Sequence, residues 1–584
     1  MQIYMNEKIG KSELFTGRKK ELAYYMNWID RIKIEASKSS AILSRRKTGK
    51  SALMQRLYNL TFEKNDIVVP FYYEIKESSQ WIFHFAKDFL LEFIYQYIAF
   101  KSRKKEYIED DEKSFDNALV FAEKENLNYL TKTIRGASSC ADNKEYDRLW
   151  DIARDAPRRI AGRTDERVVQ LIDEFQHINT HIYYDEKCAS QIKDFTASYF
   201  HTVEYMNAPL LVSGSWVGWL LKDISKLLPG RVLLTTLEDM PKEESVEMVF
   251  KYSETEGIEI SEQTAFLMAQ LCEGNPFYIS SVMRSSYPDK DLTTEEGLLK
   301  TVEFETTNKR GGIHSGWMEY IHSALDRINN INSKRIVIFL AKNRHKEFSL
   351  KDIQKALNLD MSIEELEEKL EGLIYSNIIE QGTSYFYYRG VQDNIFDKVF
   401  RSRYAGHIED FDPREITNEY KALFEESKKK YKSLEGDFNR CKGIFSEYTI
   451  INKLKHKAKK NNKAFKKMMI NIPDDFEFED YDSVWSYTAS PVHKKDFQID
   501  IFAVAKSGYS LIGEVRNRES KKFSKKDTLE FEGKAKELIE FENVTKPLLF
   551  VFSSLGFTRA ATDYMKEKGI AWAKNKKWIE KNEK

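Results

Sequence analysis

The chain has 584 residues, and its 92 Lys and Arg are balanced by 92 Asp and Glu. This length exceeds what one hydrophobic core supports, so several domains are expected, and the balanced charge excludes no class of partner. No window approaches 18 uninterrupted apolar residues and the first residues lack the apolar segment of a secretory signal, so we expect no membrane span and a cytoplasmic location. The four cysteines are far apart without a CxxC pair, which argues against a zinc or disulfide framework.

Short β-branched or aromatic runs alternate with helical stretches through the first 240 residues. Strands separated by helices predict a parallel sheet with crossover connections, which is the α/β class. The polar stretch Lys101–Arg163 is expected as a mostly helical insertion before the third strand. The expected strands are Ser40–Ser44, Ile67–Ile75, Val168–Ile172, Pro209–Ser213 and Val232–Leu237.

A candidate phosphate-binding loop (P-loop) spans Ser44 to Ser51, between the first strand and a helix. Such a loop needs backbone N–H groups around the β-phosphate, a glycine at the turn, a lysine for the β- and γ-phosphates and a hydroxyl for Mg²⁺. Gly49, Lys50 and Ser51 supply the last three, and Ser44 stands where the motif has its first glycine. The sequence therefore predicts a nucleotide site for ATP and Mg²⁺. The residues between its ends are Arg45, Arg46, Lys47 and Thr48.

An acidic pair, Asp173 and Glu174, follows the strand Val168–Ile172. At the carboxyl end of a buried strand, Asp173 can hold Mg²⁺ through water and Glu174 can activate the attacking water. An acidic pair is more often part of a solvated loop, but the apolar strand before this one favours the catalytic interpretation.

Further motifs in chain order resemble AAA+-related ATPases of the archaeal-type group within the STAND class. Phe15–Leu22 is similar to the F-x-GR-x-x-EL box of that family, and the likeness extends to about Arg403. The resemblance implies ATP binding, a helical lid over residues 241–330 and the possibility of a homo-oligomer. The nucleotide-site residues that it adds are Gly17 and Arg18 in the box, Ser213 or Ser215 on a sensor strand, Arg231 near the γ-phosphate and Pro276 in a Gly-x-Pro lid motif. The alternative for Arg231 is a solvated or salt-bridged residue at a strand edge.

Three short helices and a hairpin follow in residues 331–404, which predicts a winged helix. Its presumed recognition helix, Ile363–Leu373, is acidic, whereas a helix that faces phosphates should be basic. We therefore favour a packing module over a DNA-binding transcription regulator. The ATPase core is expected in residues 1–240. After the winged helix, a charged helical connector in residues 405–437 leads to a separate α/β domain in residues 438–584.

This last domain places paired carboxylates on adjacent expected strands, Gln498–Ala505 and Tyr509–Val515; a third strand is expected at Pro547–Phe552. Glu514 and Arg516 share one face of their strand, and Asp500 can come opposite them. Two converging carboxylates can bind Mg²⁺, with Glu447, on a helix expected to begin at Gly443, as a third acid. The alternative is an amphipathic hairpin with surface charges, against which the apolar neighbours argue.

This arrangement resembles the PD-(D/E)xK nuclease superfamily over about Phe438–Ala573. The resemblance implies a Mg²⁺-dependent nuclease in which Asp500, Glu514 and Arg516 are catalytic. Arg516 replaces the usual lysine; it keeps the charge but cannot release a proton. Both an active nuclease and an inactive tail that binds nucleic acid or protein therefore stay open.

Charge asymmetry favours DNA as the partner of this domain. From Tyr431 onward, 31 basic residues stand against 23 acidic ones. The densest segment, Lys453–Lys467, is expected on the helix that carries Glu447 and could follow a phosphate backbone. Its alternative is a solvated helix face, and Lys521–Lys526 after the Glu514 strand favours DNA. The expected function is an ATP-controlled nuclease, for defence or DNA processing.

Overall fold

The computed structural model describes residues 4–214, 224, 226, 228–328, 331–376, 378–384, 386–403, 422, 425–426, 435–481, 483–489, 497–517 and 521–579. Two compact units divide the chain. The first unit comprises Met1–Met240, Cys272–Pro288 and Val302–Ile416, and the second comprises Pro241–Leu271, Asp289–Thr301 and Thr417–Lys584. Part of the expected lid therefore belongs with the C-terminal domain. No helix in these described ranges combines the length and apolarity needed to cross a bilayer.

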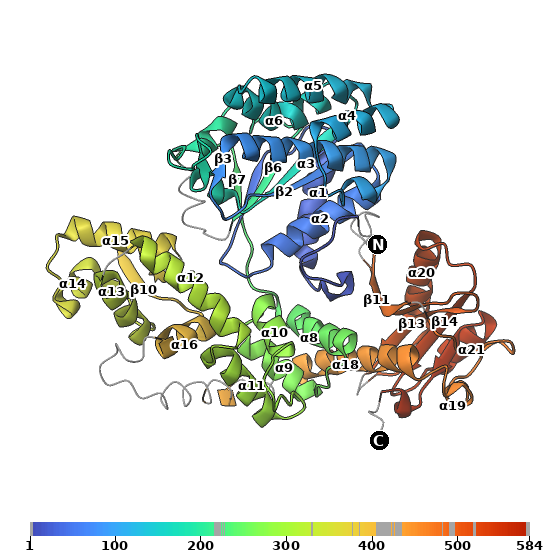
Figure 1. The fold of residues 1–584 in the computed structure, drawn as a ribbon. Helices are drawn as coiled ribbons and strands as arrows, with labels where there is room; N and C mark the ends of the chain where they lie inside the picture. Colours follow the sequence, from blue (N-terminus) through green and yellow to red (C-terminus); the bar gives the residue numbers. More distant parts are fainter. Residues whose placement is uncertain are drawn as a thin grey trace. The chain divides into compact units, whose positions relative to one another are not determined.

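The first unit is built on a parallel five-stranded sheet in the order β2-β4-β6-β1-β7 (Figure 1). Each strand lies within one residue of its expected position, which confirms the parallel α/β prediction for this part of the chain. β6 separates β1, which leads to the P-loop, from β4, which ends at Asp173. The strands are β1 (Ser40–Leu43), β2 (Val68–Glu74), β4 (Arg167–Asp173), β6 (Leu210–Gly214) and β7 (Leu233–Thr236).

Apolar helices connect these strands. α3 is buried over most of its length because apolar residues lie on most of its faces. The expected insertion is helical and packs on α3 through α4 and α6. A small parallel pair, β3 (Gln80–Trp81) and β5 (Ile182–Tyr183), lies beside the main sheet. The helices are α1 (Lys19–Ile32), α2 (Lys50–Lys64), α3 (Ile82–Ser102), α4 (Phe115–Lys124), α5 (Asn128–Asp142) and α6 (Tyr146–Ala161).

The remainder of the first unit is mainly helical. Where a winged helix is expected, three helices accompany an antiparallel sheet of order β8-β10-β9. α15 buries Leu366, Leu370 and Leu373 and exposes four of its five glutamates, with Glu367 partly buried. The elements are α10 (Pro276–Met283), α12 (Gly312–Ile328), α13 (Ile331–Lys342), β8 (Phe348–Ser349), α14 (Leu350–Leu357), α15 (Ile363–Tyr375), β9 (Ile379–Gln381), β10 (Tyr387–Gly390) and α16 (Asn394–Arg403); α11 (Glu295–Thr307) contributes to both units.

The second unit contains a five-stranded mixed sheet, β11-β12-β13-β14-β15. Ile450, Ile451 and Leu454 of α18 pack on one face, and α20 and α21 cover the other, so alternating apolar residues are buried on both sides. Its strands are β11 (Ser483–Thr488), β12 (Gln498–Val504), β13 (Ser510–Arg516), β14 (Pro547–Ser553) and β15 (Ala571–Ala573). Its helices are α8 (Lys242–Glu256), α9 (Glu262–Leu271), α18 (Glu435–His456), α19 (Asn462–Lys466), α20 (Lys525–Phe541) and α21 (Arg559–Glu567).

Two features of this unit differ from the sequence-based expectation. The short edge strands β11 and β15 were not predicted. The helix that carries Glu447 begins at Glu435, not at Gly443, and it ends at His456, so Lys457–Lys460 lie in a turn. A glycine inside a helix costs only about 1 kcal/mol relative to alanine, which the buried apolar face of α18 outweighs. The expected connector at residues 405–437 lies largely outside the described residues.

Candidate functional site

The P-loop joins the end of β1 to the start of α2. Two of its residues have left-handed backbone, Lys47 with φ 65° and Gly49 with φ 90°. Ser44 has no such φ, so the first position of this loop does not require glycine. Gly49 directly precedes α2. The amino end of α2 therefore offers backbone N–H groups and a positive dipole end to an anion.

Lys50 is buried and turns back onto its own loop. Its Nζ donates to Arg45 O at 2.7 Å and to Ser44 Oγ at 3.1 Å. The Ser44 hydroxyl also contacts Thr48 Oγ1, so the serine that replaces glycine links Thr48 to the lysine. Burial lowers the pKa of Lys50 to about 8, although the charges of Glu174 and Asp173 act in the opposite direction. An anion in the loop would supply the missing counter-charge.

Asp173 ends β4 and is completely buried. Its Oδ1 accepts hydrogen bonds from the Ser213 hydroxyl on β6 and from Glu174 N at 2.9 Å. Its Oδ2 accepts one from Tyr72 OH at 3.2 Å. The strand order thus brings Ser213 to Asp173, between the P-loop strand and the acidic strand. Hydrogen bonds from neighbouring strands fix the position of this carboxylate.

Glu174 has a left-handed backbone with φ 53° and a partly buried side chain. Its Oε2 accepts from Gln176 Nε2 at 2.6 Å and lies 3.5 Å from His177 Nε2. Burial alone would raise the pKa of Glu174, but hydrogen bonds from His177 and Gln176, with the charge of Lys50, lower it to about 2. Glu174 is therefore held as a carboxylate near the lysine.

The donor set suits Mg²⁺ bound with a nucleotide. Ser51 provides a hydroxyl on the first turn of α2, and Asp173 provides a fixed carboxylate; both are hard oxygen ligands of the kind that Mg²⁺ prefers. The buried Lys50 lacks a carboxylate within hydrogen-bond distance among the described contacts, which fits a site built for a polyphosphate.

Arg18 holds the P-loop in place at Thr48. It follows Gly17, which has φ 68°, and precedes α1, and it is buried. Its Nη2 donates to Thr48 O at 2.8 Å, and its Nη1 donates to Glu238 O. The arginine of the Phe15–Leu22 box therefore donates to the backbone of the P-loop and holds the loop in position.

The P-loop cations point toward the helical part of the same unit. Arg45 Nη1 lies 3.3 Å from Asp393 Oδ2, and that oxygen also accepts from Tyr278 OH at 2.8 Å. Lys47 Nζ lies 3.8 Å above the Phe277 ring, and the Arg46 guanidinium lies 5.1 Å from the Tyr320 ring centre. Asp393, Tyr278 and Tyr320 were not predicted as site residues, because no local pattern marks a contact across more than 200 residues.

The expected lid residue Pro276 also reaches the loop. A Cβ on Gly49 would meet Pro276 Cγ at 3.5 Å, an ordinary contact. Pro276 begins α10, where Asn275 caps the helix through Phe277 N at 2.9 Å. The Gly-x-Pro motif is therefore brought to the P-loop through the start of α10.

Arg231 is not brought to the P-loop, contrary to the expectation that it contacts the γ-phosphate. It precedes the amino end of β7, whereas the P-loop follows the carboxyl end of β1, and these strands are parallel. Its guanidinium lies 3.9 Å from the Phe200 ring centre, and its Nε lies 3.4 Å from Glu204 Oε1. The expectation failed because the motif alone does not tell at which edge of the sheet the arginine lies. Ser215, a second candidate on the sensor strand, lies outside the described residues.

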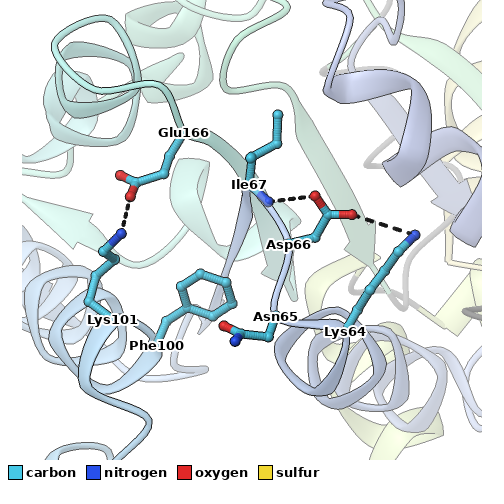
Figure 2. Close-up of a pocket in the computed structure, with 7 residues that line it drawn as sticks. All are labelled: Lys64, Asn65, Asp66, Ile67, Phe100, Lys101 and Glu166. Atoms are coloured by element: carbon cyan, nitrogen blue, oxygen red, sulfur yellow. Dashed lines mark hydrogen bonds and ion pairs between the residues drawn. The ribbon is translucent and has the colours of Figure 1, made fainter.

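A polar cavity of about 420 Å³ also lies away from the nucleotide site, at the amino ends of β2 and β4 (Figure 2). Both of its lysines already have carboxylate partners: Lys101 pairs with Glu166, and Lys64 pairs with Asp30 and, at 4.0 Å, with Asp66. This cavity has no unpaired cation for a phosphate, so we assign it no ligand. The lining residues are Lys64, Asn65, Asp66, Ile67, Phe100, Lys101 and Glu166.

In the second unit, Asp500 and Glu514 come together where the β12–β13 ladder ends. Beyond the pair Ile501–Gly513, Asp500 Oδ2 accepts from Val515 N at 2.7 Å. Arg516 Nη1 lies 3.4 Å from that oxygen, and Arg516 Nη2 forms an ion pair with Glu514 Oε1. Asp500 is 6% exposed and Glu514 is 2% exposed. One arginine therefore bridges two buried carboxylates.

Glu447 on α18 belongs to the same electrostatic cluster. Burial and the charges of Asp500 and Glu514 raise its pKa well above the usual range. Burial raises the pKa of Glu514 to about 8, with Asp500 adding to this shift and Arg516 and Lys534 opposing it. α18 is tied to the end of β13, since Asn517 Nδ2 donates to Ser446 Oγ at 2.8 Å.

The chemistry of this cluster suits a divalent cation, although its side chains are not arranged around one. Glu514 Oε2 is buried and has no hydrogen-bond partner, so an oxygen ligand is left over in the site. Yet no group of three or more His, Cys, Asp or Glu side chains within the described ranges is arranged to hold a metal ion. Arg516 supplies the counter-charge that a metal would bring.

Comparisons with known proteins find only distant likenesses. No family model matches the chain, and neither does any curated protein. Among solved structures, the chain is similar to the Walker-type ATPase of Pyrococcus abyssi, with 14% identity and a TM-score of 0.42 over 68% of this chain and 100% of that one. It is also similar to the ORC2 protein of Aeropyrum pernix with ADPNP and ADP, with 12% identity and a TM-score of 0.37 over 66% and 93% of the two chains. The RuvB Holliday junction branch migration motor of Thermotoga maritima gives 11% identity and a TM-score of 0.31 over 67% and 96%. At such TM-scores we base no functional assignment on these likenesses.

Proposed function

We propose that the first unit binds and hydrolyses ATP with Mg²⁺. The observation that carries this proposal is the meeting, at the carboxyl ends of β1, β6 and β4, of the loop Ser44–Ser51 with Ser213, Asp173 and Glu174. Ligands of open α/β sheets bind at this edge of the sheet. Bound Mg²⁺ would neutralise charge on the phosphates. Lys50 would move from loop carbonyls to phosphate oxygens, and Glu174, kept ionised, would accept the proton of the attacking water.

Two substitutions test the ATPase proposal. Lys50→Ala should abolish ATP binding, because it removes the buried cation of the loop. Glu174→Gln should keep ATP binding but lower turnover by about a hundredfold or more, because it removes the general base. Binding is measured by titration with a fluorescent ATP analogue and turnover by phosphate release. Wild type that binds no ATP in the presence of Mg²⁺ would contradict the proposal.

We further propose that residues 241–330 act as the lid of this ATPase and that residues 331–404 form a winged helix that packs within the chain. The contact of Asp393 with Arg45 supports the packing role, since it places this region on the P-loop. The exposed acidic face of α15 supports it too, because phosphates would be repelled there.

For the second unit we propose a PD-(D/E)xK-like nuclease that the ATPase controls. Asp500 and Glu514 on adjacent strands, with Glu447 nearby on a helix, supply carboxylates for Mg²⁺. The metal would activate water and stabilise charge on the phosphate. Arg516 would then leave the carboxylates and donate to a phosphate oxygen, a task that suits its planar fork.

The packing of α18 supports the proposed control by ATP. In the second unit, Phe250 of α8 stacks on Tyr448 of α18, with ring centres 5.6 Å apart. Lys455 of α18 lies 3.7 Å from Glu254 of α8. Helices from the proposed lid are thus attached to the helix that carries Glu447.

The alternative function is a regulatory ATP switch with an inactive tail that binds nucleic acid or protein. The bridging of both carboxylates by Arg516 favours it, because the site is already neutralised without a metal. The two functions differ in whether Arg516 releases the carboxylates.

A nuclease assay on plasmid, linear duplex and single-stranded substrates, with Mg²⁺ or Mn²⁺ and with or without ATP, separates the two functions. If the tail is a nuclease, wild type cleaves at least one substrate, and Asp500→Asn lowers the rate by about a hundredfold or more. The control is Lys506→Gln, at an exposed position in the turn that follows the other end of β12, and it should cleave like wild type. Absence of cleavage under every nucleotide condition would favour the inactive tail.

A further inference from the structure

The second unit carries an exposed basic surface at the carboxyl ends of its parallel strands. Three chain segments meet there: residues 521–526, 553–559 and 574–577, which we name the strand-end rim. Together they contain eight cations and no Asp or Glu. All eight cationic residues are exposed: Lys521, Lys522, Lys525, Lys526, Arg559, Lys574, Lys576 and Lys577.

Backbone contacts hold the three segments side by side. Phe523 N donates to Gly556 O at 3.0 Å, and Thr558 N donates to Phe523 O at 2.9 Å. A Cβ on Gly556 would lie 4.0 Å from the Lys574 side chain, which places the end of β15 beside the turn after β14. The rim is therefore one continuous surface although its segments are far apart in sequence.

The rim adjoins the carboxylate cluster. Arg516 is the register partner of Ser553, and Ser554 N donates to Arg516 O at 3.1 Å. The bridging arginine thus sits at the strand end from which the segments 521–526 and 553–559 continue. A polyanion on the rim would run past the site of the proposed chemistry.

The rim cations, which include the predicted segment Lys521–Lys526, are free to bind an anion, whereas the lysines of the other predicted segment, Lys453–Lys467, are partly engaged. In the described part of the chain, no carboxylate lies within ion-pair distance of a rim cation; Lys525 alone has a ring contact, 5.1 Å from Tyr564. In Lys453–Lys467, by contrast, Lys459 pairs with Asp480 at 2.6 Å and Lys466 pairs with Glu477 at 2.7 Å. Lys453 is buried and donates to Lys577 O, and Lys455 pairs with Glu254.

We propose that the strand-end rim, and not the helical segment Lys453–Lys467, is the surface that binds the phosphate backbone of a nucleic acid. A row of cations without carboxylate partners in the described part of the chain complements a polyphosphate and would release counterions on binding. The Asp527 carboxylate next to the first segment is occupied by Ser524, whose N and Oγ both donate to it. This inference rests on the proposed function only in its choice of nucleic acid as the partner. It places the backbone next to Asp500 and Glu514.

Binding of a short fluorescein-labelled DNA duplex tests this proposal, measured by anisotropy over a salt series in EDTA, where metal-dependent cleavage cannot occur. Two rim triples are compared with wild type: Lys574→Gln with Lys576→Gln and Lys577→Gln, and Lys521→Gln with Lys522→Gln and Lys526→Gln. Each should weaken binding about tenfold or more and reduce the salt slope by roughly one to three, because each lost phosphate contact contributes about 0.9. The full-length chain is used throughout, and circular dichroism confirms folding.

The matched control is Lys457→Gln with Lys460→Gln and Lys463→Gln, three exposed lysines from the helical segment with the same charge change. It should change the affinity for DNA by less than about threefold, because salt screens charges that do not contact the DNA. Binding to anionic vesicles is measured in parallel with the same variants. The proposal is overturned if wild type does not bind the duplex, or if the control weakens DNA binding as much as the rim triples. It is also overturned if the rim triples lose binding to the vesicles but keep their binding to DNA. If DNA binding depends on the rim but wild type cleaves no substrate, the proposed binding surface is supported and the proposed nuclease activity is contradicted.

Discussion

At the scale of single residues, buried charge marks both candidate sites. Lys50 is enclosed by loop carbonyls and keeps its proton with difficulty, while Glu174 stays ionised through hydrogen bonds and the lysine. In the second unit, Glu514 is enclosed with Asp500 and one arginine. In each site the protein pre-positions charge that a phosphate or a metal would balance, which is typical of functional sites.

The lowered pKa of Lys50 predicts how ATP affinity depends on pH. Without nucleotide its pKa is about 8, and bound phosphates would raise it. Below pH 8 the lysine is charged in both states, so affinity should be flat. Above pH 8 binding takes up a proton, so affinity should fall by up to about tenfold per pH unit. Titration with a fluorescent ATP analogue across this range measures the break.

Two variants show which lysine causes the change in slope near pH 8. Lys50→Arg should remove it, since arginine stays charged throughout. Burial also lowers the pKa of Lys47 to about 8, so Lys47→Arg is the matched control and should keep the break. A break that survives in Lys50→Arg and disappears in Lys47→Arg would show that the wrong lysine was assigned.

At the scale of elements, the P-loop depends on contacts from outside its own strand and helix. Arg18 at the start of α1 donates to Thr48 O, and Ser44 links Thr48 to Lys50. The serine at the first position therefore takes part in the loop's hydrogen bonding.

Removing the Arg18 contacts should loosen the loop. Arg18→Met leaves two carbonyls without charged donors, each worth about 1.5–3 kcal/mol. We expect ATP affinity to fall by about tenfold and the melting temperature to drop, as measured by analogue titration and thermal unfolding. Arg31→Met, on the same helix but exposed, is the control. Unchanged ATP affinity in Arg18→Met would contradict the tethering role.

Local patterns predicted most of the elements well. The strands around the P-loop and Asp173 were found within one residue because β-branched runs end at polar turns. β11 and β15 were missed: β15 is only three residues long, and β11 pairs with β12 through an irregular register at Trp485–Tyr487. The α18 start was missed because Gly443, the residue expected to begin it, lies inside the helix.

At the scale of the whole molecule, the two compact units cut across the expected domain boundaries. α8 and α9, which follow the ATPase core in sequence, belong to the unit that holds the carboxylate cluster. The stacking of Phe250 on Tyr448 makes α8 and α18 one packed element within that unit. A movement of α8 would therefore act directly on the helix that carries Glu447.

Truncating this contact should uncouple cleavage from ATP. Phe250→Ala removes a buried ring, so the position of α8 would no longer determine that of α18, and cleavage rates with and without ATP should become equal while ATP turnover remains. Phe531→Ala, a similar truncation in α20 on the other face of the sheet, should keep the ATP dependence. A Phe250→Ala protein that responds to ATP like wild type would exclude this route of control.

Short spacings and the periods of strands and helices were enough to predict the P-loop, the acidic pair after the third core strand, and the alternation that brings Asp500 and Glu514 to neighbouring strands. Long-range packing was needed to show that Arg231 lies at the other edge of the sheet, that Asp393 contacts the P-loop, and that Arg516 bridges both carboxylates. It also decided which lysines are already paired and which form the strand-end rim. Such contacts join residues tens to hundreds of positions apart, and packing, not local pattern, selects them.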